Sequence, residues 1–166
     1  MGGYKDGEVQ IVQVDPFHPT FGLLFPFLLR RMLDFAHTHY DEIAPDEQVR
    51  ELGMRVVAGD KHVLLLAFLA PDGKLLGHCV CFLMEAYGKR WLFVSQCKLD
   101  VPAGDTISRA IKIGEEFARN LGATMLLFET KRSDSAWARQ FGFKVTRHIM
   151  IKYLDERKGE GEETRG

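Results

Sequence analysis

A short loop runs directly into a helix beyond the middle of the chain, and the backbone and polar groups at the helix start have the chemistry to bind an anion. The segment Asp100-Val-Pro-Ala-Gly-Asp-Thr-Ile-Ser108 precedes an amphipathic stretch, which places Gly104, Asp105 and Thr106 at the expected helix start. The first N–H groups of a helix have no partner within it, and the helix dipole makes this end positive. The loop is therefore a candidate site for a phosphate or diphosphate.

Asp105 gives the same loop a second interpretation. Asp and Thr are frequent N-cap residues, whose side-chain oxygens accept hydrogen bonds from the first helical N–H groups. A capping Asp105 would occupy the donors that a diphosphate needs, and its charge would repel that group. Thr106, Ser108 and Arg109 are the side chains that could compensate. A well-capped helix start and an anion-binding loop both remain open.

The strand before this loop carries the side chains that could take part in proton transfer. In Phe93-Val-Ser-Gln-Cys-Lys98, strand alternation puts Ser95 and Cys97 on one face and Gln96 on the other. Ser95 or Gln96 could hold a water that passes a proton, and Cys97 is a conceivable nucleophile if a base lies near it. Glu85, in the connection before this strand, is a further candidate.

The cysteines do not form a metal-binding pattern. In His78-Cys79-Val80-Cys81, alternation turns the histidine away from both thiols, so the three cannot converge on one ion. No paired C-x-x-C spacing occurs, and the three cysteines are an odd number. We expect reduced thiols in the core and no metal.

Alternating and helical hydrophobic patterns predict the elements that position these residues. Pro26 is expected to kink or restart the first helix. Pro71-Asp-Gly-Lys74 predicts a turn between two strands, and Gly122 predicts a helix end. The predicted order is strand 9–14, helix 17–39, helix 45–58, strands 63–70, 75–84 and 90–99, helix 106–121, strand 123–129, a short helix from 133 or 134 to 142, strand 143–154 and a disordered polar tail, 155–166.

This order resembles that of the GNAT N-acyltransferases. The matching text is Gly114-Glu-Glu-Phe-Ala-Arg-Asn-Leu-Gly-Ala-Thr-Met-Leu-Leu-Phe128, followed by Phe141-Gly142-Phe143. The resemblance implies an α/β (α+β) fold, with a mixed, centrally splayed sheet and helices on both faces. It also implies one domain over residues 1–154, with 155–166 as the tail.

The resemblance further implies transfer of an acetyl group from acetyl-CoA, as co-substrate, to a primary amine of a small molecule or peptide by direct attack. The loop is shorter than in typical members and keeps only Gly104 of their glycines. Ala138 stands where many members have a tyrosine acid. A catalytically inactive binding or assembly module with the same fold is the alternative. The residues that the resemblance assigns to the cofactor are Lys98, Leu99, Val101, Gly104, Asp105, Thr106, Ser108 and Arg109.

Composition narrows the class of partner. Hydrophobic residues make up 46% and charged residues 27%, and the net charge of −1 provides no field to attract nucleic acid or an anionic membrane. The longest apolar run, Phe21 to Leu29, is too short to span a bilayer, and the N-terminus has no signal-peptide layout. We expect a cytoplasmic protein. The first helix has more aromatic residues than one buried stripe requires, which predicts a substrate pocket or a homo-oligomer interface.

Overall fold

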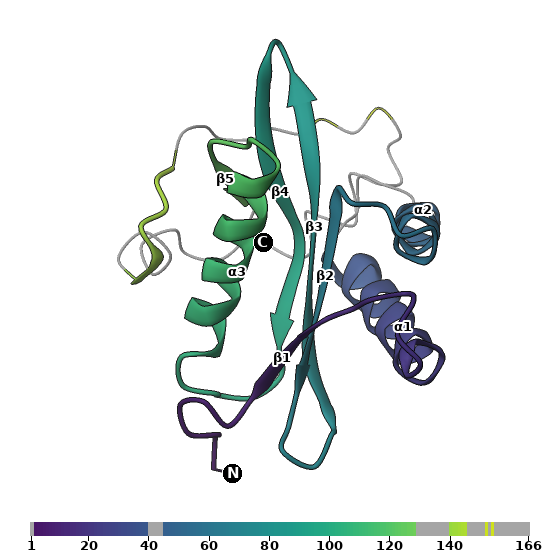
Figure 1. Ribbon diagram of the computed structural model, residues 1–166, viewed down its shortest axis with the longest axis vertical. Helices are drawn as coiled ribbons and strands as arrows, with labels where there is room; N and C mark the ends of the chain where they lie inside the picture. Colours follow the sequence, from purple (N-terminus) through teal and green to yellow (C-terminus); the bar gives the residue numbers. More distant parts are fainter. Residues whose placement is uncertain (1, 40–44, 129–139, 146–151, 153, 155–166) are drawn as a thin grey trace. The chain divides into compact units, whose positions relative to one another are not determined.

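The computed structural model describes residues 2–39, 45–128, 140–145, 152 and 154. The chain divides into two compact units, residues 1–129 and 130–166. The first unit contains a five-stranded sheet and three helices, which form the mixed α/β architecture that the sequence predicts (Figure 1).

The sheet is mixed and follows the chain order β1-β2-β3-β4-β5. The first four strands are antiparallel, and β5 runs parallel to β4. The turn after β2 forms as predicted: Gly73 has φ 89°, and the Asp72 carboxylate accepts a 3.0 Å hydrogen bond from the Lys74 N–H. The strands are β1 (Gln10–Gln13), β2 (Val63–Leu69), β3 (Leu75–Ala86), β4 (Lys89–Leu99) and β5 (Leu126–Phe128).

The β3–β4 hairpin is tighter than the sequence predicts. The pattern ends the strand at Met84 and assigns Glu85–Lys89 to a connection, whereas the strands pair through Ala86 and Lys89. Only Tyr87 and Gly88 remain in the turn, with φ of 52° and 73°. Two consecutive positive φ values match the twist of a two-residue hairpin, so pairing extends through residues that look like a loop.

Helices cover both faces of the sheet (Figure 1). The α1 helix (Phe21–His39) and the α2 helix (Pro45–Val57) pack on one face, around Leu65 and Val80. The α3 helix (Thr106–Asn120) packs on the other face, around Leu64 and Leu92. The buried residues of α3 are all small (Thr106, Ala110, Gly114 and Ala118), which lets its backbone approach the sheet closely.

Two details of α1 differ from prediction. The helix continues through Pro26, so the expected restart is wrong. Pro26 is in the second turn, where it lacks the N–H that would bond to the Gly22 carbonyl and its ring lies toward that carbonyl, yet the helix continues. The spacing of three and four residues between Leu24, Phe27, Leu28, Arg31, Met32 and Phe35 predicts one inward stripe, but Phe27 is 64% exposed and Phe25 is buried instead.

The end of α3 follows the prediction. Most of the elements predicted after β5 lie outside the described residues. Gly122 has φ 73° directly after the helix, and the Ala123 N–H donates to the Ala118 carbonyl at 2.9 Å. The predicted strand 143–154 and tail 155–166 lie mostly or wholly outside the described residues. In the second unit, Gln140 and Phe141 are helical, and Gly142 has φ 73°. None of the described helices is both long enough and apolar enough to cross a membrane.

Candidate functional site

The middle of β4 changes its pairing at a bulge. Val94 lies opposite Cys81 and Gln96 lies opposite Val80, so Ser95 is the extra residue. On the other edge, β5 pairs in parallel with Leu92–Val94. From Gln96 to Leu99, no strand among the described residues lies on that edge. Every second residue there turns its N–H and C=O toward that edge, where an extended ligand could pair with them.

The chain leaves β4 and enters α3 at the end of this strand. Asp105 occupies the N-cap position, as predicted, but its side chain makes no capping hydrogen bond. Its carboxylate instead accepts a 3.0 Å hydrogen bond from Arg109 Nε. Within the described part of the chain, the N–H groups of Ile107 and Ser108 have no hydrogen-bond partner. Of the two interpretations that the sequence left open, the one in which the Asp105 side chain occupies these donors does not hold, because its carboxylate bonds to Arg109 one turn later.

Thr106 is part of the loop's own structure. Its hydroxyl donates a 2.6 Å hydrogen bond to the Ala103 carbonyl, and its backbone N–H donates to the same oxygen at 3.1 Å. The residue is fully buried. Thr106 therefore shapes the helix start, whereas Ser108 is partly exposed in the first turn of α3.

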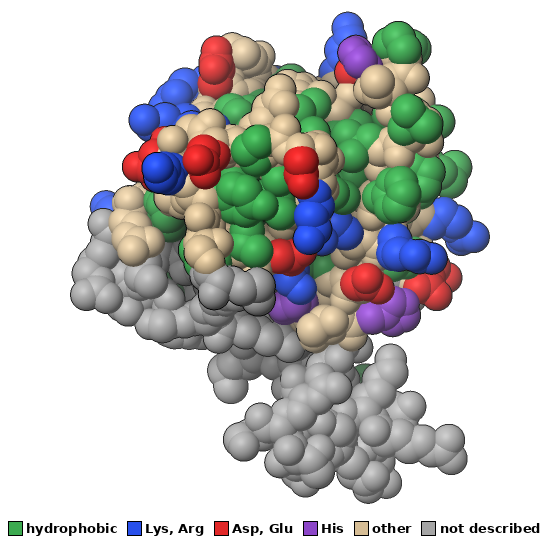
Figure 2. All heavy atoms as spheres, turned by 90° about the horizontal axis from the view of Figure 1, so that it is seen from below, with side chains coloured by type: hydrophobic (Ala, Val, Ile, Leu, Met, Phe, Trp, Pro, Cys, Tyr) green, Lys and Arg blue, Asp and Glu red, His purple; other side chains and the backbone are tan. Residues whose placement is uncertain are grey.

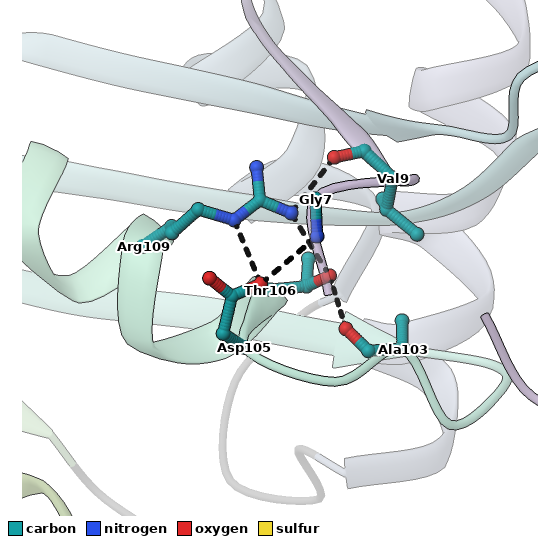
Figure 3. A network of polar contacts seen from close by, with 6 residues as sticks. All are labelled: Gly7, Val9, Ala103, Asp105, Thr106 and Arg109. Atoms are coloured by element: carbon teal, nitrogen blue, oxygen red, sulfur yellow. Dashed lines mark hydrogen bonds and ion pairs between the residues drawn. The ribbon is translucent and has the colours of Figure 1, made fainter. Parts of the chain in front are cut away.

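The N-terminal segment lies against this loop, which the sequence analysis does not anticipate (Figure 3). The Tyr4 N–H donates to the Pro102 carbonyl at 2.9 Å, and the Gly7 N–H donates to Asp105 Oδ1 at 3.4 Å. Arg109 donates through a terminal nitrogen to the Val9 carbonyl at 2.8 Å. These contacts join residues about one hundred positions apart, a separation at which local sequence patterns give no signal.

Positive and negative side chains are interspersed at the end of the first unit that contains the loop between β4 and α3. Figure 2 views that end, and Lys and Arg side chains there are interleaved with Asp and Glu. Arg31 of α1 donates to both carboxylate oxygens of Asp100, at 2.8 and 2.9 Å. This guanidinium holds the pKa of Asp100 below its ordinary value. Both Arg31 and Arg109 therefore already have carboxylate partners.

A buried hydrogen-bond chain connects the bulged part of the sheet with α1. His78 Nε2 donates to Gln96 Oε1 at 2.7 Å, and Gln96 Nε2 donates to the Met32 carbonyl at 3.1 Å. Both side chains are fully buried. Burial lowers the pKa of His78 to about 4, so its ring is neutral at pH 7. Each end of the Gln96 amide thus makes a hydrogen bond within the protein, and the side chain has no exposure to solvent.

The other predicted catalytic candidates lie in different environments. Ser95 is buried at the bulge. Cys97 lies opposite Cys79, whose hydrogen bond, together with burial, raises the pKa of the Cys97 thiol. Glu85 is paired with Arg90 Nε at 2.7 Å near the β3–β4 turn, far along the strand from Cys97. Ser95 and Cys97 thus lie beside the candidate ligand edge, and Glu85 does not.

The other residues that the resemblance assigns to the cofactor lie between the end of β4 and the loop before α3. Lys98 and Leu99 end the strand, with the Lys98 side chain exposed and Leu99 partly buried. Val101 packs against the α3-side core, and Gly104 has φ 53°. Among the described residues, no group of three or more His, Cys, Asp or Glu side chains is arranged to hold a metal.

Comparisons with known proteins show what this arrangement is similar to. No family model matches the sequence, and no curated protein matches it. An aminoglycoside acetyltransferase from an uncultured soil metagenomic sample, solved with trehalose, aligns with a TM-score of 0.62 at 14% identity, covering 90% of this chain and 97% of its own.

Two further solved structures align over similar lengths. Glucosamine-6-phosphate N-acetyltransferase from Arabidopsis thaliana has a TM-score of 0.58 at 9% identity, covering 89% of this chain and 99% of its own. AAC(6')-Iy in complex with the bisubstrate analogue CoA-S-monomethyl-acetylneamine has a TM-score of 0.58 at 13% identity, covering 89% and 98%. At these identities the likeness concerns the fold. The chain is a divergent protein with the fold of the GNAT acetyltransferases.

Proposed function

We propose that the protein is an N-acetyltransferase that moves an acetyl group from acetyl-CoA to a primary amine. The observation that carries the proposal is the edge of β4 from Gln96 to Leu99, which leads to the N–H groups of Ile107 and Ser108 at the start of α3. The pantetheine arm would pair with the strand edge, and the diphosphate would lie at the helix start. A structural neighbour, AAC(6')-Iy, was solved with a CoA conjugate.

The chemistry requires little from side chains. The neutral amine nitrogen attacks the thioester carbonyl carbon, the C–N bond forms, the C–S bond breaks, and the CoA thiolate leaves. The proton lost by the nitrogen passes to solvent or to the departing sulfur. The protein would supply orientation, and backbone N–H groups of β4 would stabilise the negative charge on the carbonyl oxygen. A small-molecule or peptide amine fits this reaction as the acceptor.

Isothermal titration with CoA and two charge variants of α3 tests this assignment. Ser108→Glu places a carboxylate beside the donors proposed for the diphosphate, and we expect it to weaken CoA binding at least about tenfold. Asn120→Glu is the matched control, because it also replaces an uncharged side chain with a carboxylate, at an exposed position at the far end of the same helix. Wild-type protein that gives no heat at millimolar CoA, or equal effects of the two variants, would contradict the proposal.

A non-catalytic binding module is the second candidate, favoured by the exposed apolar side chains of α1. Leu23 is 75% and Phe27 64% exposed, although each lies in a largely hydrophobic helix. Such a face is typical of an interaction surface. This candidate predicts a homo-oligomer that Phe27→Lys converts to monomer. Light scattering that shows only monomer for the wild type would count against it.

A further inference from the structure

The first residues of the chain, 2–8, lie against the loop that leads into the helix start to which the diphosphate is assigned above. We refer to them as the N-terminal strap. The Tyr4 N–H bonds to the Pro102 carbonyl at 2.9 Å, and the Gly7 N–H reaches Asp105 Oδ1 at 3.4 Å (Figure 3). The strap therefore contacts the loop on both sides of Gly104.

The Asp6 side chain occupies the space beside Gly104 in the loop. A Cβ built on Gly104 would collide with the Asp6 carboxylate, so that side chain lies directly against the Gly104 backbone. In a phosphate-binding loop, a glycine allows the ligand to approach the backbone closely. Here a carboxylate of the same chain occupies the space that glycine leaves.

The charges at this position oppose a diphosphate. Asp6 and Asp105 both lie at the loop, and Arg109 is the cation in contact with it. The Arg109 side chain already donates to Asp105 at 3.0 Å and to the Val9 carbonyl at 2.8 Å. Its positive charge is therefore directed to groups of the protein, and a diphosphate would have to compete for it.

The strap is held by few interactions. Glu8 and Lys5 form a local turn, in which the Glu8 carboxylate accepts a 2.8 Å hydrogen bond from the Lys5 N–H. Only Tyr4 of the strap is partly buried, and the others are exposed, whereas Val9, directly before β1, is fully buried. Displacement of residues 2–8 would break the packing of Tyr4 against the α3-side core, but it would leave the pairing of β1 with β2 in place, because that pairing begins at Gln10.

We propose that the N-terminal strap is an autoinhibitory segment that acetyl-CoA must displace, with Asp6 as its blocking group. The inference rests on the function proposed above, since it concerns regulation of the same site. The strap keeps the affinity for CoA low while it lies on the loop. Any contact that draws residues 2–8 away raises that affinity.

Calorimetry with CoA on matched variants tests the strap. Asp6→Asn keeps the shape of the side chain and removes its charge, and we expect the affinity for CoA to rise about three- to tenfold. Glu8→Gln is the control: it removes one negative charge from the same segment, away from Gly104, and should leave the affinity within about twofold. Because the charges are exposed, the gain from Asp6→Asn should shrink as salt is raised.

Deletion of residues 2–7 should raise the affinity at least as much as Asp6→Asn. If the truncated protein folds poorly, the two point variants still decide the question. Equal affinities for wild type, Asp6→Asn and Glu8→Gln, with measurable CoA binding in all three, would overturn the strap and leave the proposed function standing. No heat from any variant at millimolar CoA would overturn both.

Discussion

Protonation of His78 should destabilise the protein as the pH falls. His78 is fully buried on the α1 side of the sheet, and its Nε2–H donates to Gln96 Oε1. Burial is the main reason that its pKa falls from 6.5 to about 4, and the Gln96 hydrogen bond acts in the opposite direction. Nearby charges add smaller effects: Arg31 and Lys98 lower the pKa, and Asp100 raises it.

The direction of this pH effect on the free energy of unfolding follows from the protonation of His78 in the folded and unfolded chains. An unfolded chain protonates His78 near pH 6.5, whereas the folded protein keeps it neutral down to about pH 4. The contribution of His78 to the free energy of unfolding is therefore intact above about pH 6.5 and is lost as the pH falls toward about 4. The pKa difference corresponds in full to about 3 kcal/mol, of which about 2 kcal/mol is lost by about pH 5.

Urea unfolding followed by circular dichroism at about pH 7.5 and about pH 5 measures this loss. The comparison protein is His78→Leu, whose side chain does not titrate. The variant also leaves Gln96 Oε1 without its donor, which changes the free energy of unfolding at every pH. The quantity to compare is therefore the change in that free energy between the two pH values in each protein. The five other histidines are common to both proteins and cancel. If wild type and His78→Leu lose the same free energy between the two pH values, the reasoning is wrong.

Two further predictions concern packing in the sheet and its thiols. Gly77→Ala should lower the free energy of unfolding by about 1–3 kcal/mol, because the new Cβ would collide with the Lys98 backbone carbonyl; urea unfolding measures this. Gly22→Ala, with no atom within 4 Å of the new Cβ, is the control and should stabilise α1 by up to about 1 kcal/mol; similar losses in both would refute the packing argument. The pKa values of Cys79 and Cys97 are raised, first by thiol–thiol hydrogen bonds and then by burial, so both should react with a disulfide reagent about a hundredfold more slowly in native protein than in urea. Rapid labelling of two thiols in the native state would contradict this.

Much of the fold could be predicted because its signals are local. The apolar run of β2, the turn at Pro71–Gly73 and the helical spacing of α3 each lie within a few residues of sequence. Errors occurred where two local patterns competed. In α1, Phe25 and Phe27 are both aromatic and close in sequence, and only packing against the sheet determines which one is buried.

The candidate site was less predictable. The sequence placed Asp105 at the start of α3, where propensity favours it, but could not show which donor its carboxylate meets. Arg109 lies one turn away and was visible in the pattern, whereas Gly7 is 98 positions away. The sequence offered Gln96 as a candidate to hold a water, but could not show that its amide bonds to His78 and to the Met32 carbonyl.

Local patterns in the sequence were enough to predict the order of elements from β1 to β5 and the position of the α3 start, since periodicity and turn chemistry act over short distances. Tertiary structure alone decided what lies on that helix start. The antiparallel course of β1, β2 and β3 brings the beginning of the chain to the end of β4, where Asp6 meets Gly104 and Arg109 reaches Val9. Contacts of this kind depend on how strands far apart in sequence are arranged, and no local pattern encodes them.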